Sequence, residues 1–275
     1  MKKIILASGS PRRRELLQML NIPFEVKVSD VEETVPSEYD TTPADRVKYL
    51  SLIKSRAVAD IVENNTIINQ YLKEIRSIDI QNDSMRFRHN IERIGEMMAY
   101  EISKTLSYQT ENIQTPLDVA QVNTPTDAIV LGTVLRAGLP FHQGFLHVYD
   151  HAENAFISAY RKMVTNEKGE KELKIIAEYL AAPQIQDKTL LLVDPMLATG
   201  MSMEIAYKAL LAHGTPKNTH ICCTIGTPNA IAYLEENMPQ DCTLWCAAID
   251  PILNEKKYIV PGLGDAGDLC FGEKL

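Results

Sequence analysis

The stretch that says most about the fold of this 275-residue sequence spans residues 190–202: Leu190-Leu191-Leu192-Val193-Asp194-Pro195-Met196-Leu197-Ala198-Thr199-Gly200-Met201-Ser202. Its four leading apolar residues predict a strand that is buried on both faces, and a helix is expected from about Ser202 to His213. A short loop of small residues, which begins with Asp194, joins the two. A buried strand that runs through such a loop into a helix is typical of a βαβ unit and predicts a parallel sheet.

The alternation of strand and helix extends on both sides of this stretch. Strands are predicted at 128–131, 156–160, 189–193, 219–225 and 243–249, and a helix at 230–236. A turn at 166–169 between two extended arms indicates a hairpin, which could form a flap or a dimer contact. Two helices are expected before the sheet, one along Ile68–Ile75 and a longer one capped by Ser84. The sequence therefore predicts an α/β fold with helices on both faces of a parallel sheet.

Residues 1–64 differ from the rest of the chain in charge. They carry equal numbers of basic and acidic side chains, so the whole net charge of −8 belongs to residues 65–275. Within this block we expect a strand at 3–7, a helix from Ser10, a strand at 24–28 and a helix from Pro43 to about Val62. The asymmetry indicates two domains of different origin, at 1–64 and 65–275.

The overall composition excludes several classes of protein. The chain is 45% hydrophobic and 23% charged, which is ordinary for a globular protein. Its negative net charge argues against a general nucleic-acid binder or a binder of anionic membranes, although it leaves room for a local basic pocket. No apolar run is long enough to span a membrane, and the apolar run at the N-terminus is too short for a signal peptide. We therefore expect a cytoplasmic protein.

The five cysteines are expected to be buried, reduced thiols. Their number is odd, and all of them lie in apolar surroundings in the last fifth of the chain. Cys242 and Cys246 are four residues apart, but no matching pair of cysteines or histidines follows them. The pattern therefore predicts neither a disulfide framework nor a zinc site.

The loop after the strand at 189–193 is the strongest candidate for a binding site. Backbone N–H groups in such a turn, together with the N-terminus of the following helix, can bind an anion. Thr199 and Ser202 add hydroxyl donors, and Asp194 can accept hydrogen bonds from the hydroxyl groups of a sugar. The combination suits a ribose 5-phosphate. An ordinary strand-to-helix turn with a capped helix is an equally good interpretation from the residues alone.

Two further features point to phosphate and to a planar ligand. Residues 261–268 hold three glycines and two aspartates, so their backbone can approach the edge of a flat ligand; a surface loop is the alternative. Arg136 and Arg161 each follow an apolar strand, and arginine binds phosphate with two parallel hydrogen bonds. Solvated surface charges are the alternative for the two arginines.

Taken together, these residues resemble the uracil branch of the type I phosphoribosyltransferases. Residues 194–202 look like the loop that binds 5-phosphoribosyl-1-diphosphate (PRPP), with Pro195 where most of the superfamily has a second acidic residue. Met201 departs from the branch, which usually has glycine there. Residues 258–268 resemble the uracil-binding segment, and residues 135–139 and 160–161 match the segments that carry the two PRPP arginines. Residues 84–88 and 99–101 match the N-terminal helix of the family.

The resemblance implies a fold and a role for each matching residue. The fold would be that of a type I phosphoribosyltransferase, with a parallel sheet flanked by helices, a hairpin arm and a C-terminal hood, preceded by a small α/β fragment. Asp194, Arg136 and Asp265 would be catalytic. The PRPP site would comprise Arg136, Arg161, Asp194, Pro195, Met196, Leu197, Ala198, Thr199, Gly200, Met201, Ser202 and Asp265. The uracil site would comprise Tyr258, Ile259, Gly264, Asp265 and Ala266.

The resemblance also implies a reaction and partners. Uracil and PRPP would give UMP and diphosphate in pyrimidine salvage, with Mg²⁺ carried by PRPP rather than held at a metal site of the protein. The family suggests a dimer or a higher homo-oligomer, and GTP is a candidate effector. A regulator that senses nucleotides without turnover is an alternative, supported by Met201 and by the unusual N-terminal block.

Residues 1–62 resemble the opening of the Maf family of nucleotide pyrophosphatases. The likeness rests on residues 6–17, on Glu32-Glu33 and on residues 44–59 with Lys54. It stops before the strand that carries the family's catalytic acid, so we expect an inert fragment, although its Ser8, Arg12, Arg13 and Lys54 could bind phosphate. A bifunctional enzyme that also cleaves nucleoside triphosphates is the alternative.

Overall fold

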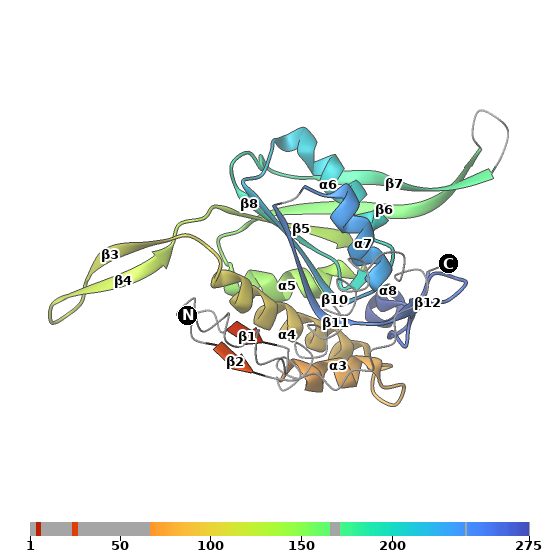
Figure 1. Cartoon of the computed structure of the whole chain (residues 1–275), viewed down its shortest axis with the longest axis horizontal. Coiled ribbons are helices and arrows are strands. Elements are labelled where there is room, and N and C mark those ends of the chain that lie inside the picture. Colours follow the sequence, from red (N-terminus) through yellow and green to blue (C-terminus); the bar gives the residue numbers. More distant parts are fainter. Residues whose placement is uncertain (1–3, 7–23, 27–66, 166–170, 240, 275) are drawn as a thin grey trace. The chain divides into compact units, whose positions relative to one another are not determined.

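The computed structural model describes residues 4–6, 24–26, 67–165, 171–239 and 241–274 (Figure 1). The chain divides into two compact units, Met1–Asn69 and Gln70–Leu275. In the first unit, strand β1 (Ile4–Leu6) pairs in parallel with β2 (Phe24–Val26), which confirms the two strands expected there. The helices expected from Ser10 and from Pro43 lie outside the described residues.

The second unit is built on a mostly parallel sheet. Its central strands are β5 (Ile129–Leu135), β6 (Glu153–Thr165), β7 (Lys171–Ala181), β8 (Thr189–Val193), β10 (Asn218–Gly226) and β11 (Cys242–Ile249). They lie in the order β11-β10-β8-β5-β6-β7, and all neighbours are parallel except β6 and β7. Each strand predicted in this part of the chain is confirmed. The antiparallel pair β6–β7 forms the two arms of the expected hairpin, whose turn at 166–169 lies outside the described residues.

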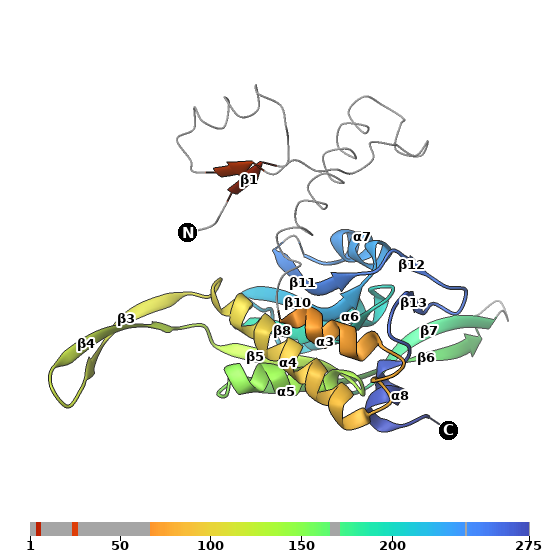
Figure 2. The ribbon, with the colours of Figure 1, turned by 90° about the horizontal axis from the view of Figure 1, so that it is seen from below.

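Helices cover both faces of this sheet, as predicted. Figure 1 and Figure 2 show one group of helices on one face and a second group on the other. The first group consists of α3 (Ile68–Arg76), α4 (Ser84–Ser103) and α5 (Gly138–Val148), and the second of α6 (Met201–Leu210) and α7 (Pro228–Asn237). A 3₁₀ turn at Leu211–His213 extends α6 to the end that the sequence predicts.

The cap of α4 differs from the prediction. Asp83, not Ser84, is the N-cap residue, and its side chain accepts a hydrogen bond of 3.0 Å from the backbone N–H of Arg86. An aspartate at this position satisfies a free N–H group and places a negative charge at the positive end of the helix dipole. The predicted apolar face of α4 is confirmed, because Phe87, Ile91 and Ile94 are fully buried.

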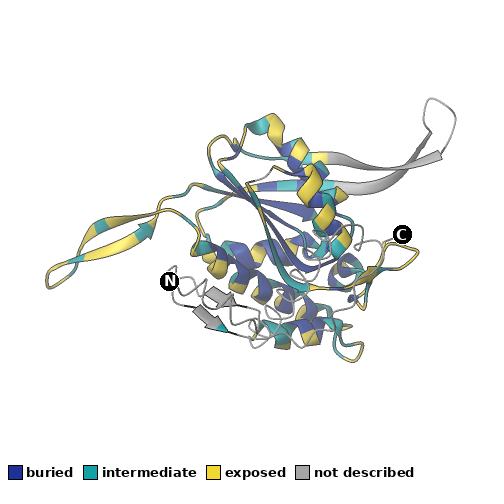
Figure 3. Ribbon diagram, viewed as in Figure 1, coloured by how far each residue is buried: buried dark blue, intermediate teal, exposed yellow. Residues whose placement is uncertain are grey.

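The central strand β8 is buried on both faces. All five of its residues are inaccessible to solvent, as the continuous apolar run predicts (Figure 3). One core packs β8 and its neighbours against α6 and α7, through side chains that include Leu190, Leu192 and Met203. Parallel strands need cover on both faces, and the helices on the two sides of the sheet provide it.

The five cysteines are free, as expected. Cys222, Cys223 and Cys270 are buried, and Cys242 and Cys246 are half-buried.

Among the described residues, no helix combines the length and the apolar composition needed to cross a bilayer.

Two elements of the second unit were not predicted from the sequence. The first is a hairpin of β3 (Tyr108–Gln114) and β4 (Val119–Pro125), whose strands are mostly polar and exposed, so no apolar alternation marks them. The second is α5, which contains proline and glycine. Gly144 is required there, because a Cβ atom on it would lie 2.0 Å from the backbone oxygen of Glu92 in α4. Close packing of two helices thus outweighs the low helix propensity of glycine.

Candidate functional site

A cavity of about 530 Å³ opens where the parallel strands β5 and β8 end. Arg136 directly follows β5, and Asp194 directly follows β8. Ligands of α/β sheets bind at the carboxyl ends of the strands, so this is the expected place for a site. The cavity brings together many of the residues predicted from the sequence: Arg136, Asp194, Met196, Ala198, Ser202, Tyr258, Ile259, Gly264, Asp265 and Ala266.

The loop between β8 and α6 is anchored to the neighbouring strand β10. Met196 and Leu197 form the short strand β9, which pairs with the end of β10. The carbonyl oxygen of Pro195 accepts hydrogen bonds from the N–H groups of Thr224 and Ile225, at 3.1 and 3.0 Å. Gly200 then takes a φ of +80°, which favours glycine, and is the N-cap residue of α6. These contacts hold the backbone of the loop in one shape.

Among the residues whose side chains the structure describes, five that were predicted for the PRPP site do not line the cavity. The side chain of Leu197 is buried in the core beneath α6 and α7, and Pro195, Thr199, Gly200 and Met201 are likewise absent from the cavity wall. What they can contribute is backbone geometry and the free N–H groups of the first turn of α6.

Thr227 supports the loop and was not singled out from the sequence. Its hydroxyl donates a hydrogen bond of 2.8 Å to the carbonyl oxygen of Ala198 and accepts one of 3.1 Å from the N–H of Ala230. Its own N–H donates to the carbonyl oxygen of Leu197 at 3.2 Å. A threonine before a proline predicts the cap of α7, but only the fold brings that cap to the loop.

Asp194 has an unusual electrostatic environment. Burial raises the pKa of its carboxyl group to about 7, against an ordinary value of 3.8, while a hydrogen bond from the N–H of Met196 opposes the rise. A carboxyl group with such a pKa at the wall of a cavity is typical of a functional site, because the free protein gains nothing from burying a charge there.

Arg136 reaches from the end of β5 to the C-terminal helix α8 (Ala266–Phe271). Its Nη2 donates to Oδ1 of Asp268 at 2.7 Å, and its Nη1 donates to the carbonyl oxygen of Gly272 at 3.3 Å. Its Nε is buried and has no hydrogen-bond partner in the described part of the chain. Buried N–H groups are normally paired, so this donor indicates a place for a ligand anion.

Arg161, the second predicted arginine, lies in β6. Its side chain is outside the described part of the structure. Its predicted role in binding diphosphate therefore stays a prediction.

The other wall of the cavity is a small C-terminal hood, formed by β12 (Ile252–Leu253), β13 (Ile259–Val260) and α8. Asp265 caps α8 by accepting a hydrogen bond of 3.0 Å from the N–H of Asp268. Gly264, with a φ of +94°, exposes its backbone beside Asp265. The hood thus presents the backbone of residues 264–266 to the cavity.

A partly buried ion pair holds the hood to α3. Both terminal nitrogens of Arg76 donate to the carboxylate of Asp250, at 2.8 and 2.9 Å, and Nη1 also donates to the carbonyl oxygen of Gly262 at 3.1 Å. The N–H of Gly262 donates to the same carboxylate at 2.9 Å. Neither Arg76 nor Asp250 was predicted from the sequence. Asp250 follows β11 directly, as Asp194 follows β8. Its position at the end of a strand could therefore have marked it as a candidate residue.

Three lysines of the cavity wall were also missed: Lys256, Lys257 and Lys274. The Nζ of Lys274 lies 3.7 Å from Oδ2 of Asp265. With Arg136 they gather positive charge in one cavity of an acidic protein, which suits a ligand that carries phosphates.

Comparison with known proteins agrees with this geometry. Residues 62–273 match the family model described as uracil phosphoribosyltransferase, and residues 3–71 match the one described as Maf-like protein. A uracil phosphoribosyltransferase of Porphyromonas gingivalis is 54% identical over 211 residues, which cover 77% of this chain and 96% of that protein. One of Pyrococcus furiosus is 36% identical over 216 residues, which cover 78% of this chain and 89% of that protein.

A solved structure shows a similar fold over the same share of the chain. The AQ2163 protein from Aquifex aeolicus aligns with a TM-score of 0.65 at 28% identity, and the alignment covers 77% of this chain and 97% of that one. The fold, the cavity and the sequence relatives therefore lead to one conclusion: the chain belongs to the uracil phosphoribosyltransferase family.

Proposed function

We propose that the protein transfers the 5-phosphoribosyl group of PRPP to N1 of uracil, which yields UMP and diphosphate. The observation that carries the proposal is that one cavity joins the loop after β8, Arg136 and the hood segment 258–266. The loop and Arg136 suit a phosphorylated sugar, and the hood segment suits the edge of a base. Membership in the family supports the same pentosyltransferase reaction.

The PRPP side of the cavity would bind the sugar and its phosphates. Asp194 accepts hydrogen bonds from the ribose hydroxyl groups, and the N–H groups at the start of α6, with the hydroxyl of Ser202, hold the 5′-phosphate. The guanidinium of Arg136 turns its unpaired Nε–H to the diphosphate. As the diphosphate departs, this fixed positive charge stabilises the charge that develops on it.

The hood side would bind uracil through its backbone. The main chain of Ile259 and of residues 264–266 contacts the edge of the base. These contacts hold the base with N1 facing C1′ of the ribose. Ribosyl transfer passes through a state with oxocarbenium character. Holding the two reacting atoms in line supplies much of the rate, because orientation removes the entropic cost of their encounter.

We also propose that Mg²⁺ enters with PRPP. Asp194 and Asp265 both line the cavity, and carboxylate oxygens are ligands that Mg²⁺ prefers. The site therefore fits a magnesium ion bound to the diphosphate. When bound, the ion neutralises part of the diphosphate charge.

The direct test measures UMP formation from uracil and PRPP by the full chain and by a chain that begins near residue 65. We expect equal rates, because every residue assigned to the cavity lies after that point. Absence of UMP at saturating substrates would contradict the proposal, and binding without turnover would favour a nucleotide-sensing regulator instead.

The match of residues 3–71 to the Maf-like family favours a second candidate activity, cleavage of nucleoside triphosphates to monophosphates. Release of diphosphate from UTP or dTTP without PRPP would support it. The fragment is expected to be inert, because the acid-bearing strand of that family has no counterpart in the sequence.

We propose further that the protein is a homo-oligomer assembled through the β3–β4 hairpin. Figure 1 and Figure 2 show the hairpin extending away from the sheet. Its apolar side chains are exposed, with Leu117 at 97%, Val119 at 52% and Val122 at 44%. A two-stranded hairpin without a packed face is marginal in water, so a second copy of the chain is its expected cover.

The double substitution Leu117→Ser with Val122→Ser is expected to shift the protein toward a monomer, because it removes the apolar surface that the partner would cover. Light scattering after size-exclusion chromatography measures the mass. The control is Ile78→Ser, which alters an apolar side chain that is 76% exposed outside the hairpin and should leave the mass unchanged. An unchanged oligomer in the double variant would place the interface elsewhere.

The family resemblance also leads us to propose a setting and an effector. The setting is pyrimidine salvage in the cytoplasm, and the effector is GTP. Adding GTP to the UMP assay tests the effector directly.

A further inference from the structure

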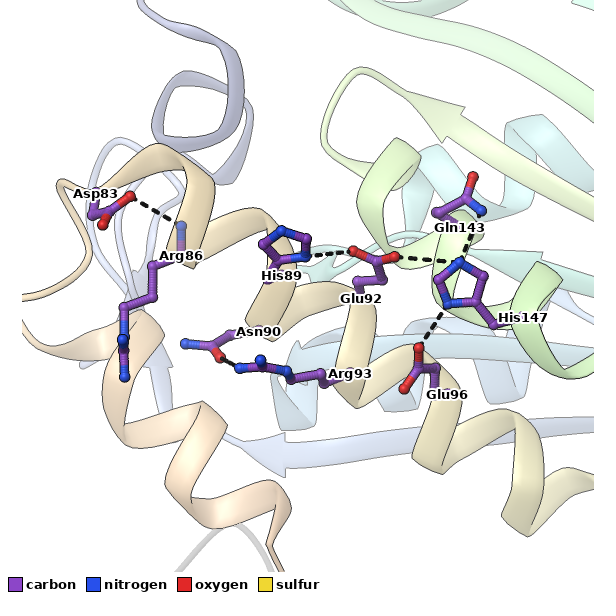
Figure 4. A network of polar contacts seen from close by, with 9 residues as sticks. All are labelled: Asp83, Arg86, His89, Asn90, Glu92, Arg93, Glu96, Gln143 and His147. Atoms are coloured by element: carbon purple, nitrogen blue, oxygen red, sulfur yellow. Dashed lines mark hydrogen bonds and ion pairs between the residues drawn. The ribbon is translucent and has the colours of Figure 1, made fainter.

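Four side chains on the outer side of α4 and α5 form a compact polar cluster (Figure 4). His89, Glu92 and Glu96 lie on one face of α4, and His147 reaches across from α5. One ligand atom from each of Glu92, Glu96 and His147 lies within 4.8 Å of the others. None of the four residues lines the cavity described above, and the proposed transferase reaction does not use them.

The packing of the two helices places these side chains. The Cα of Gly144 in α5 lies against the backbone of Glu92 in α4, where a side chain would not fit. The hydroxyl of Tyr149, after α5, donates a hydrogen bond of 2.7 Å to the carbonyl oxygen of Ala99 in α4. His147 is therefore held over α4 by rigid elements, as a preorganised metal site requires.

His147 has the hydrogen-bonding pattern of a metal-binding histidine. Its Nδ1 lies 2.7 Å from Oε1 of Glu96, so the ring donates there and carries its lone pair on Nε2. The side-chain amide of Gln143, 3.1 Å from Nε2, is placed to donate to that lone pair. A carboxylate that orients a histidine through its second nitrogen is the usual partner of a metal ligand.

Glu92 supplies the matching oxygen. Its Oε1 lies 3.4 Å from Nε2 of His147. Two ligands of a tetrahedral zinc ion, with bonds of about 2.0–2.1 Å, are separated by roughly this distance. Its Oε2 lies 3.0 Å from Nδ1 of His89, which makes His89 the nearest further nitrogen ligand.

The charges of the cluster favour a divalent cation. With neutral histidines, Glu92 and Glu96 bring two negative charges close together, and neither pairs with a lysine or an arginine in the part of the chain that the structure describes. Imidazole nitrogen combined with carboxylate oxygen suits zinc and its neighbours in the transition series better than Mg²⁺ or Ca²⁺.

We propose that this cluster is a binding site for a transition-metal dication of the zinc class. Glu92 and His147 bind the ion directly, Glu96 orients the imidazole ring, and His89 with water completes the coordination. The ion would join α4 to the end of α5.

The experiment titrates ZnCl₂ into the full chain after dialysis against a chelator, with excess MgCl₂ present throughout. Calorimetry counts the zinc ions bound per chain, and thermal unfolding reports the change in Tm. We expect Glu92→Gln and His147→Gln each to bind one zinc ion fewer per chain than the unsubstituted protein. Saturating zinc should raise the Tm of the unsubstituted protein by about 4 °C more than that of either variant.

Graded and matched variants separate this site from zinc bound by cysteines. Glu96→Gln should weaken binding at the site by about 10- to 100-fold, because it removes only the orienting carboxylate. The controls Glu101→Gln, on α4, and His151→Gln, just after α5, change exposed residues outside the cluster and should bind as the unsubstituted protein does. Equal zinc binding by the unsubstituted protein and His147→Gln would overturn the proposal, and so would displacement of the zinc by magnesium.

Discussion

The substitution Asp194→Asn is expected to lower kcat/KM for PRPP by about 100-fold or more, because an amide would replace the charged group that we propose accepts hydrogen bonds from the ribose hydroxyls. The same substitution should make the ligand-free protein more stable above pH 7. Burial raises the pKa of Asp194 to about 7, so folding buries a carboxylate that water would solvate better. Opposite effects on activity and stability would mark Asp194 as a residue kept for function.

The pH dependence of stability follows from the direction of this pKa shift. Between about pH 4 and pH 7 the native protein holds a proton that the unfolded chain has released, so the free energy of unfolding of the unsubstituted protein falls as the pH rises through that range. Asp194→Asn removes this contribution. We expect a gain of about 2 kcal/mol above pH 7, less than the full linkage value because water in the cavity screens the charge.

Urea unfolding across the pH range, together with initial rates of UMP formation, measures both effects. Asp150→Asn, which changes an exposed aspartate, is the control and should alter neither. Normal use of PRPP by Asp194→Asn would remove Asp194 from the sugar site.

The substitution Arg76→Met is expected to lower the free energy of unfolding by about 3 kcal/mol, because it leaves the buried carboxylate of Asp250 without its charged partner. It should also raise KM for uracil more than KM for PRPP. Arg76 and Asp250 together hold the carbonyl oxygen and the N–H of Gly262, which leads into the hood backbone at 264–266. In the proposed reaction Arg76 would act on uracil only through this backbone, as a positioning residue.

Urea unfolding and separate titrations of uracil and PRPP measure these effects. Arg76→Lys keeps the charge but loses the two-nitrogen contact, so it should fall between the unsubstituted protein and Arg76→Met. The control Lys104→Met breaks an exposed ion pair with Glu101 and should cost at most about 0.5 kcal/mol. Equal increases of both KM values would point to general loosening of the protein rather than to support of the hood.

Local patterns predicted a large part of the second unit. The run Leu190–Val193 indicated a strand buried on both faces, and the periodic apolar residues of α4 indicated its buried side. The order of residues after β8 also predicted where Asp194 and Ser202 would lie relative to the sheet. These predictions were correct because the pattern of apolar residues along a short segment indicates both burial on two faces and helical periodicity.

Other elements left little or no local trace. The β3–β4 hairpin has no buried face, so its sequence does not alternate between apolar and polar residues. Helix α5 contains glycines that oppose helix formation, and the reason for Gly144 lies far away along the chain, in the backbone of Glu92. Gly144 is therefore explained by the close approach of α5 to α4 and not by helix propensity.

The sequence by itself determined the alternation of strands and helices, the strand ends that carry Arg136 and Asp194, and the composition of the loops that follow them. Only the tertiary structure decided that Asp250 and Arg76 pair across 174 positions of the chain, and that Lys274 faces Asp265. The same holds for His147, which meets Glu92 and Glu96 because two helices pack closely. Propensity and periodicity act over a few residues, whereas a charge gains its partner only when the packed core brings distant segments together.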